Sequence, residues 1–282
     1  MTRPGGTEAF DAPDGLAGYR WRATRPRASL LLQHGYAEHA GRYVDHANGL
    51  IPNLTSLGIE VFAFDLAGHG RSPGRRGDTN VFRMIQVHMS MRHAIASAAR
   101  PIFLLGHSLG GLVTAASAAA APGGIAGVLL SAPALPFDVP TRQRLLVRTI
   151  AAILPMAGVT PPGDGGELSR IEAEVRAYQA DPLIFRRKLP ARIADSAVRA
   201  ADRMWRALPD WRAPTLVVHG TADCATDPDG SRRLTNMISS SDKELLMVAD
   251  GRHELLNDVA RDATLAHMLD WLDRRIGGAM VA

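Results

Sequence analysis

Two segments of this chain place a serine between glycines in the pattern Gly-x-Ser-x-Gly. They are Gly70-Arg71-Ser72-Pro73-Gly74 and Gly106-His107-Ser108-Leu109-Gly110. A serine in this pattern can act as a nucleophile when a buried strand leads into it and a helix follows, because that sharp turn exposes the hydroxyl. The backbone N–H of the next residue then helps to bind the oxyanion of an acyl-transfer intermediate. The pattern therefore suggests acyl transfer but does not decide between the two serines.

Ser108 meets these requirements and Ser72 does not. Pro73 follows Ser72 and has no N–H to offer an oxyanion, and a polar, loop-like segment comes after it. Ser108 instead follows an apolar, strand-like run and precedes a helical pattern of small residues. We therefore predict Ser108 as the nucleophile and the N–H of Leu109 as one oxyanion donor.

A serine nucleophile needs a base to take its proton and an acid to orient that base. On sheets with such a turn, the chain order is Ser, then Asp or Glu, then His. Asp223 lies a short turn after the apolar run 215–219, and His253 lies a short turn after 245–249. Both fall at the carboxyl ends of predicted strands, where Ser108 is expected as well. We predict Asp223 as the acid and His253 as the base.

Three other residues compete for these roles. Asp227 and Asp229 are alternative acids, but they lie further into the loop after Asp223. His267 is an alternative base, but it falls inside a carboxy-terminal helical pattern, which is typical of a surface or packing residue.

A second oxyanion donor is expected from the loop after an early strand. The apolar run 30–33 leads into His34-Gly35, so the N–H of Tyr36 is the candidate. His34 and His39 could also be interpreted as metal ligands. No matching carboxylate or cysteine cluster accompanies them, so we expect neither a metal nor an organic cofactor.

Apolar, β-rich runs recur along the chain, at 29–33, 60–65, 102–105, 127–131, 215–219 and 245–249. Several are apolar throughout, which is typical of parallel strands covered by helices on both faces. Helical patterns lie between them, including 112–121 and a long one at about 255–276. This alternation predicts an α/β fold with a mostly parallel, doubly wound sheet.

The alternation breaks between about residues 135 and 208. This stretch is mostly helical in pattern and contains a turn-rich segment at 160–166. We therefore predict a core at 1–134 and 208–282, with residues 135–207 inserted as a helical cap over the carboxyl edge of the sheet.

Composition bounds the protein class. The chain has 282 residues, of which 46% are hydrophobic and 21% charged, values typical of a globular protein with a large core. The formal net charge is +4, but the arginines are scattered and the densest run, Arg186-Arg187-Lys188, is short. Nucleic-acid-binding motifs are absent from the sequence, so we expect no nucleic-acid partner.

The cellular location is predicted from the cysteine content and from the search for a membrane span or a secretory signal. Cys224 is the single cysteine, so neither an intramolecular disulfide nor a thiolate metal site can form; we expect it to pack as a small residue, with chemical modification as the alternative. Residues 101–137 carry no charge, but glycines and prolines interrupt them, so we reject a membrane span. No secretory signal is visible at 1–15, and we expect a cytoplasmic protein.

Several segments give the chain a resemblance to a known family. They read HGYAEHAGRY at 34–43, FDLAGHGRSPGRRG at 64–77, GHSLGG at 106–111, LSAPAL at 130–135, VVHGTAD at 217–223 and GRHELLND at 251–258. These segments resemble the monoacylglycerol lipase and lysophospholipase group of α/β-hydrolases, a group also described as serine aminopeptidase-like. The cap stretch 175–184 is similar as well, so the resemblance covers nearly the whole chain. Residues 53–58 and 80–93 depart from the family's usual sequence pattern.

The resemblance implies the α/β-hydrolase fold and gives the residues predicted above the same roles. It also implies that Glu38 and Arg42 shape the polar end of the substrate pocket, where a glycerol-like head would lie. An internal salt bridge that fixes their loop is an equal alternative. The implied substrates are carboxylic esters, above all monoacylglycerols, with lysophospholipids or general esters as the next option. A peptidase, a thioesterase or a catalytically silent binding protein are the remaining alternatives.

The cap stretch 143–154 is apolar on more than one face. It is either a helix packed on the core or a lid that touches membranes or micelles transiently, and Arg142, Arg144 and Arg148 would suit the second role. Peripheral attachment to membranes is therefore a further option for location. Nothing in the sequence predicts the oligomeric state.

Overall fold

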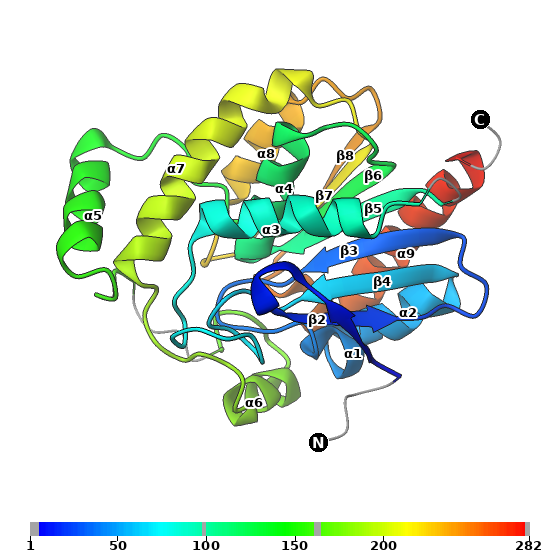
Figure 1. Ribbon diagram of the computed structural model, residues 1–282, viewed down its shortest axis with the longest axis horizontal. Coiled ribbons are helices and arrows are strands. Elements are labelled where there is room, and N and C mark those ends of the chain that lie inside the picture. Colours follow the sequence, from blue (N-terminus) through cyan, green and yellow to red (C-terminus); the bar gives the residue numbers. More distant parts are fainter. Residues whose placement is uncertain (1–5, 98–99, 161–164, 280–282) are drawn as a thin grey trace.

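The computed structural model describes residues 6–97, 100–160 and 165–279, and these form one eight-stranded sheet with helices on both faces (Figure 1). The strands are β1 Glu8–Asp11, β2 Ala17–Trp21, β3 Ala28–Gln33, β4 Ile59–Phe64, β5 Ile102–His107, β6 Gly127–Ser131, β7 Thr215–Gly220 and β8 Lys243–Val248. Their order in the sheet is β1-β2-β4-β3-β5-β6-β7-β8.

The six strands from β4 to β8 in that order are parallel, which confirms the predicted α/β class. β1 and β2 pair antiparallel at one edge and were not predicted. Their residues are too mixed in polarity to stand out, because an edge strand is only partly covered.

Nine helices accompany the strands within the described ranges. They are α1 Arg42–Asp45, α2 Leu50–Ser56, α3 Val81–Ala94, α4 Ser108–Ala120, α5 Thr141–Ile153, α6 Glu172–Ala180, α7 Ala191–Ala207, α8 Pro228–Met237 and α9 Arg261–Ala279. α3, α4, α7 and α8 pack on one face of the sheet, and α1, α2 and α9 pack on the other.

The parallel strands are apolar throughout because each serves two cores. Leu31 of β3 belongs to the core under α4, whereas Leu30 and Leu32 belong to the core under α9, since successive side chains of a strand point to opposite faces. All three are fully buried. Continuous apolar runs therefore identified these strands correctly.

The segment between β6 and β7 contains α5, α6 and α7. α7 lies against α3 and α4 and contributes buried residues such as Met204 to the core. α5 lies at the left of Figure 1 beside α7 and buries none of its residues. Of the turn-rich segment 160–166, residues 161–164 lie outside the described ranges. Among the helices described, none has the length and apolar character needed to cross a bilayer.

The carboxy-terminal helix begins later than its pattern predicts. Leu255–Asn257 form a short 3-10 turn, and α9 starts only at Arg261. Asp258 interrupts the helix because its carboxylate accepts the backbone N–H groups of Arg170 and Arg252. The apolar spacing at 255–256 therefore reflects a buried turn and not a helical face.

Candidate active site

Ser108 lies at the sharp turn between β5 and α4. Its φ is +53°, a left-handed conformation that costs a residue with a side chain about 1–2 kcal/mol. Glycines on either side let the chains approach closely. A Cβ at Gly110, for example, would collide with the carbonyl oxygens of Gln33 and His34. This strained strand–turn–helix is the geometry of a nucleophile elbow.

Ser72, in the competing segment, stabilises a loop. Its buried hydroxyl donates to the carbonyl of Asp65 at 2.6 Å and accepts the N–H of Ala17 at 2.9 Å. With both hydrogen bonds made inside the protein, Ser72 fastens the loop after β4 to the neighbouring strand β2.

Asp223 and His253 form a buried acid–base pair. Asp223 Oδ2 accepts the Nδ1–H of His253 at 2.7 Å. Burial by itself would raise the pKa of Asp223, but the hydrogen bonds from its histidine neighbours outweigh burial and hold that pKa well below its usual range. Burial would likewise lower the pKa of His253, but the Asp223 carboxylate raises it above the ordinary histidine value. The carboxylate therefore stays ionised and supports a positive charge on the imidazole.

His107, the residue before Ser108, packs beside the base. Its ring centroid is 4.8 Å from that of His253, and its Nδ1 lies 3.0 Å from the carbonyl oxygen of Ser131. Since Ser108 is the next residue in the chain, all three predicted catalytic residues lie at the carboxyl edge of the sheet, as their positions after β5, β7 and β8 require.

The loop after β3 comes close to Ser108. A Cβ placed on Gly35 would be only 2.9 Å from the Cβ of Ser108, so the backbone leading into Tyr36 passes directly beside the elbow. Leu109 lies in the first turn of α4, where N–H groups have no acceptor within the helix and favour an anion. The two predicted oxyanion donors thus belong to backbone segments next to the serine.

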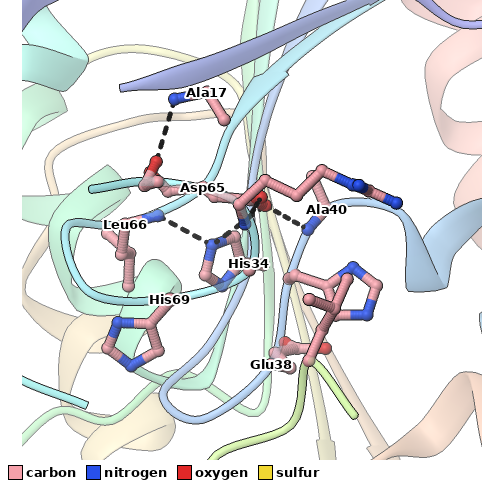
Figure 2. Close-up of polar contacts among 12 residues, drawn as sticks. Ala17, His34, Glu38, Ala40, Asp65, Leu66 and His69 are labelled. Carbon is pink, nitrogen blue, oxygen red and sulfur yellow. Dashed lines mark hydrogen bonds and ion pairs between the residues drawn. The ribbon is translucent and has the colours of Figure 1, made fainter. Parts of the chain in front are cut away.

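Asp65 holds this loop in place from β4 (Figure 2). Its Oδ1 accepts the N–H of Ala40 at 2.8 Å, while Oδ2 accepts the hydroxyl of Tyr19 at 2.6 Å. His34 Nε2 accepts the N–H of Leu66 at 2.9 Å, and its Nδ1 donates to the carbonyl of Gly35 at 2.8 Å. Both nitrogens of His34 therefore bind backbone and fix the turn.

The other candidate metal ligand, His39, contacts the region between β6 and β7. Its Nε2 lies 2.8 Å from the carboxylate of Asp181, which follows α6. The contact ties the loop after β3 to the predicted cap.

Glu38 and Arg42 belong to a buried charge network. Arg42 binds Glu254 through two hydrogen bonds of 2.8 and 2.9 Å and Glu38 through one of 3.0 Å. Glu38 also accepts the N–H of Gly35 at 2.6 Å. Although burial opposes ionisation, Arg42 lowers the pKa of Glu254 to about 2. Because Glu254 follows His253 in the chain, the network connects the base to the oxyanion loop.

These contacts match the internal salt bridge that was one of the two interpretations of Glu38 and Arg42. The same residues also line a small cavity together with His107 and Ser131. A role of the pair in binding a substrate head group stays a prediction.

Replacing Arg42 by leucine should destabilise the protein by about 3–5 kcal/mol, because two buried carboxylates would lose their shared cation. Urea unfolding measures this directly. Arg176→Leu is the control, since Arg176 forms an exposed i,i+4 pair with Glu172, and such a pair contributes little. Equal losses of unfolding free energy in the two variants would contradict a large contribution of the Arg42 network to stability.

Two residues at the acid escaped the sequence analysis. The Thr226 hydroxyl donates to Asp223 Oδ2 at 2.8 Å, and its N–H donates to Oδ1 at 3.0 Å. His219 Nε2 lies 3.1 Å from the same Oδ2. His219 stands four residues before Asp223, but in a strand-to-turn segment this spacing has no fixed geometry, so no local signal identified it.

The competing residues have other partners. Asp227 accepts the N–H of Asp229 and caps the start of α8. His267 Nε2 lies 2.6 Å from a carboxylate oxygen of Glu244 on β8. Cys224 is exposed, so the prediction that it packs as a small residue was wrong: the turn after β7 directs Asp223 inward and its neighbour outward.

A mostly parallel sheet, a strained serine at a strand–helix turn and a histidine–aspartate pair at the same edge define an α/β-hydrolase. The family model described as "Serine aminopeptidase, S33" matches residues 24–260. The chain belongs to this family, and the resemblance inferred from the sequence is confirmed.

Known proteins are similar to this chain along nearly its full length. The human monoglyceride lipase is 34% identical over 93% of this chain and 88% of its own. The monoacylglycerol lipase of Mycolicibacterium smegmatis is 32% identical over 88% and 89%. The solved structure of the Paleococcus ferrophilus monoacylglycerol lipase superposes with a TM-score of 0.81 at 32% identity, covering 92% of this chain and 99% of that one. These similarities confirm the predicted class of serine ester hydrolases.

Proposed function

We propose that this ester hydrolase acts on monoacylglycerols, with Ser108 as nucleophile, His253 as base and Asp223 as acid. The observation that carries the proposal is the buried His253–Asp223 hydrogen bond at the same sheet edge as the left-handed Ser108. The relatives named above supply the substrate class, since their names specify monoglycerides or monoacylglycerols.

The reaction proceeds through an acyl-enzyme. Ser108 Oγ attacks the ester carbonyl while His253 Nε2 takes its proton. The N–H groups of Tyr36 and Leu109 bind the resulting oxyanion. Collapse breaks the ester C–O bond, and His253 gives its proton to the leaving glycerol oxygen. Water, deprotonated by His253, then attacks the acyl carbonyl; the acyl–Ser108 C–O bond breaks, His253 returns the proton to Ser108 Oγ, and the fatty acid is released.

The pH dependence should follow His253. The base must be neutral to accept the Ser108 proton, and the Asp223 carboxylate raises the pKa of His253 although burial opposes this. We expect kcat/KM to fall as the pH drops through that pKa, with a midpoint above that of an ordinary histidine. A profile of kcat/KM on a soluble ester measures it, and a midpoint below the ordinary histidine range would contradict the assignment.

A substrate panel tests the proposed function. Purified protein is given monoacylglycerols of several chain lengths, a lysophospholipid, p-nitrophenyl esters, an acyl thioester and aminoacyl amides. We expect the highest kcat/KM on monoacylglycerols. The same triad can cleave any acyl bond, and the family description names an aminopeptidase, so preference for an aminoacyl amide would overturn the proposal.

We also propose that residues 135–207 form the cap, with α5 as a lid that meets lipid aggregates. Leu145 and Leu146 are 64% and 60% exposed, and Ile153 and Leu154 at the end of the helix are 71% and 63% exposed. Such a cluster on one short helix is typical of a lipid-contacting surface. Arg144 is not free for lipid head groups, because it pairs with Asp202 of α7. Transient contact with membranes would make the protein peripheral.

Replacing both Leu145 and Leu146 by serine should lower the rate on aggregated long-chain monoacylglycerol about tenfold, because less apolar area enters the lipid. The rate on a soluble short-chain ester should stay unchanged. Val259→Ser is the matched control, since Val259 is 61% exposed but lies outside the cap. An equal loss on both substrates would count against a lid that binds lipid.

A further inference from the structure

His219 is a second histidine on the carboxylate of Asp223. It is the penultimate residue of β7, and its Nε2 lies 3.1 Å from Asp223 Oδ2. The same oxygen accepts the Nδ1–H of His253 at 2.7 Å. Neither the His219 nor the Asp223 side chain has any exposed surface. One carboxylate oxygen therefore contacts two imidazoles in a place closed to bulk water.

The neighbours of His219 decide which of its nitrogens carries the proton. An ionised carboxylate can only accept hydrogen bonds, so Nε2 must present its proton to Asp223. Nδ1 of a neutral ring is then an acceptor, and it lies 2.7 Å from the hydroxyl of Ser231 on α8. Ser231 is fully buried and can donate to Nδ1. The acceptor-only carboxylate thus selects the tautomer in which His219 donates to the acid, and the Ser231 hydroxyl satisfies the other nitrogen.

We propose that His219 is a positioning residue that donates a second imidazole hydrogen bond to Asp223 and tunes how strongly this acid holds the proton of His253. The inference rests on the proposed triad. Asp223 shares its charge between two imidazole donors, so it stabilises the His253 imidazolium less than it would with His253 as its single imidazole donor. His253 can then return its proton more readily to the leaving alcohol.

The electrostatics of the acid agree with this role. The pKa of Asp223 is depressed, against the effect of burial, by hydrogen bonds from both His219 and His253. The acid therefore stays ionised with two imidazole donors on one oxygen.

Several other polar groups surround the base and its acid. Those that face His253 or Asp223 are His107 on β5, Thr226 after β7, Glu254 beside the base, Glu38 after β3, and Arg42, which pairs with both glutamates. Among these groups, Thr226 also contacts His219, with its Oγ1 3.3 Å from Nε2. A shift of the pH profile that appears with leucine and is reversed by glutamine would therefore report the lost donor at the position of Nε2.

The test compares His219→Leu with His219→Gln on a soluble p-nitrophenyl ester across pH. Leucine removes the donor, so the acid limb of kcat/KM should move to higher pH, and the plateau should fall about tenfold, the effect of one hydrogen bond to a charged group. The side-chain amide of glutamine can place an N–H near the position of Nε2, so His219→Gln should restore the wild-type limb.

His88→Leu is the matched control. His88 on α3 is also fully buried and pairs with a serine, its Nδ1 lying 2.9 Å from the hydroxyl of Ser117, but it does not contact Asp223. We expect this variant to lose thermal stability without any shift of the acid limb. If His219→Leu does not fold, His219→Asn replaces it, because its shorter amide cannot reach Asp223.

The inference is overturned if folded His219→Leu keeps the wild-type acid limb, or if the leucine and glutamine variants shift alike. Either result would give His219 a purely structural role. Ser108→Ala is run in the same assay to judge the proposed function separately. If Ser108→Ala hydrolyses the ester as the wild type does, the triad itself fails, whatever the His219 variants show.

Discussion

Ser108→Ala should lower kcat for ester hydrolysis by about a millionfold, because nothing else at the elbow can form the acyl-enzyme. Covalent labelling by a fluorophosphonate probe should disappear at the same time. The fold should be retained, because alanine removes only the hydroxyl and leaves the backbone turn unchanged. The measurements are single-turnover kinetics, probe labelling read by intact mass, and a thermal melt.

Ser72→Ala is the matched control, since Ser72 is the central residue of the other Gly-x-Ser-x-Gly segment. It should keep both labelling and turnover. The substitution removes two buried hydrogen bonds, one to the carbonyl of Asp65 and one from the N–H of Ala17. Leaving these two partners unsatisfied should lower the free energy of unfolding by about 1–3 kcal/mol. Labelling that persists in Ser108→Ala and vanishes in Ser72→Ala would reverse the assignment of the nucleophile.

Asp223→Asn should lower kcat by about ten-thousandfold with little change in shape. The asparagine amide cannot accept hydrogen bonds on both of its polar atoms, and it carries no charge to stabilise the His253 imidazolium. The base would then adopt the wrong tautomer or turn away from Ser108. Kinetics on the best substrate of the panel measure the loss, and the melting temperature checks folding.

Asp227→Asn is the control for the acid. Asp227 is exposed and caps α8, and asparagine caps a helix about as well as aspartate. We expect full activity in this variant. Loss of activity in Asp227→Asn, with Asp223→Asn active, would move the acid role to the competing residue.

The predicted catalytic residues could be found from the sequence because the relevant information is local. A short apolar run followed by a turn marks the carboxyl end of a strand, and parallel strands bring those ends to one edge. Ser108, Asp223 and His253 each follow such a run. Pro73 excluded Ser72 by covalent structure alone.

The surroundings of the triad could not be found in this way. Arg42 and Glu254 are 212 residues apart in the chain, and their pairing depends on the conformations of two loops that have no periodic pattern. In the sequence His219 is an ordinary residue of a buried strand, and only the turn after β7 brings the Asp223 carboxylate to its side chain. The exposure of Cys224 was mispredicted for the same reason, since a turn decides which of two neighbours points inward.

The elbow at Ser108 thus depends both on local sequence and on tertiary structure. Its residue types, its flanking glycines and the N–H of Leu109 are properties of consecutive residues, so the sequence by itself determined the α/β class and was enough to predict the nucleophile. Only the tertiary structure decided what surrounds it: Gly35 beside the serine, Arg42 joining two loops, and two histidines on one carboxylate. Contacts of this kind arise where separate loops meet, and their geometry depends on how the whole sheet and its helices pack.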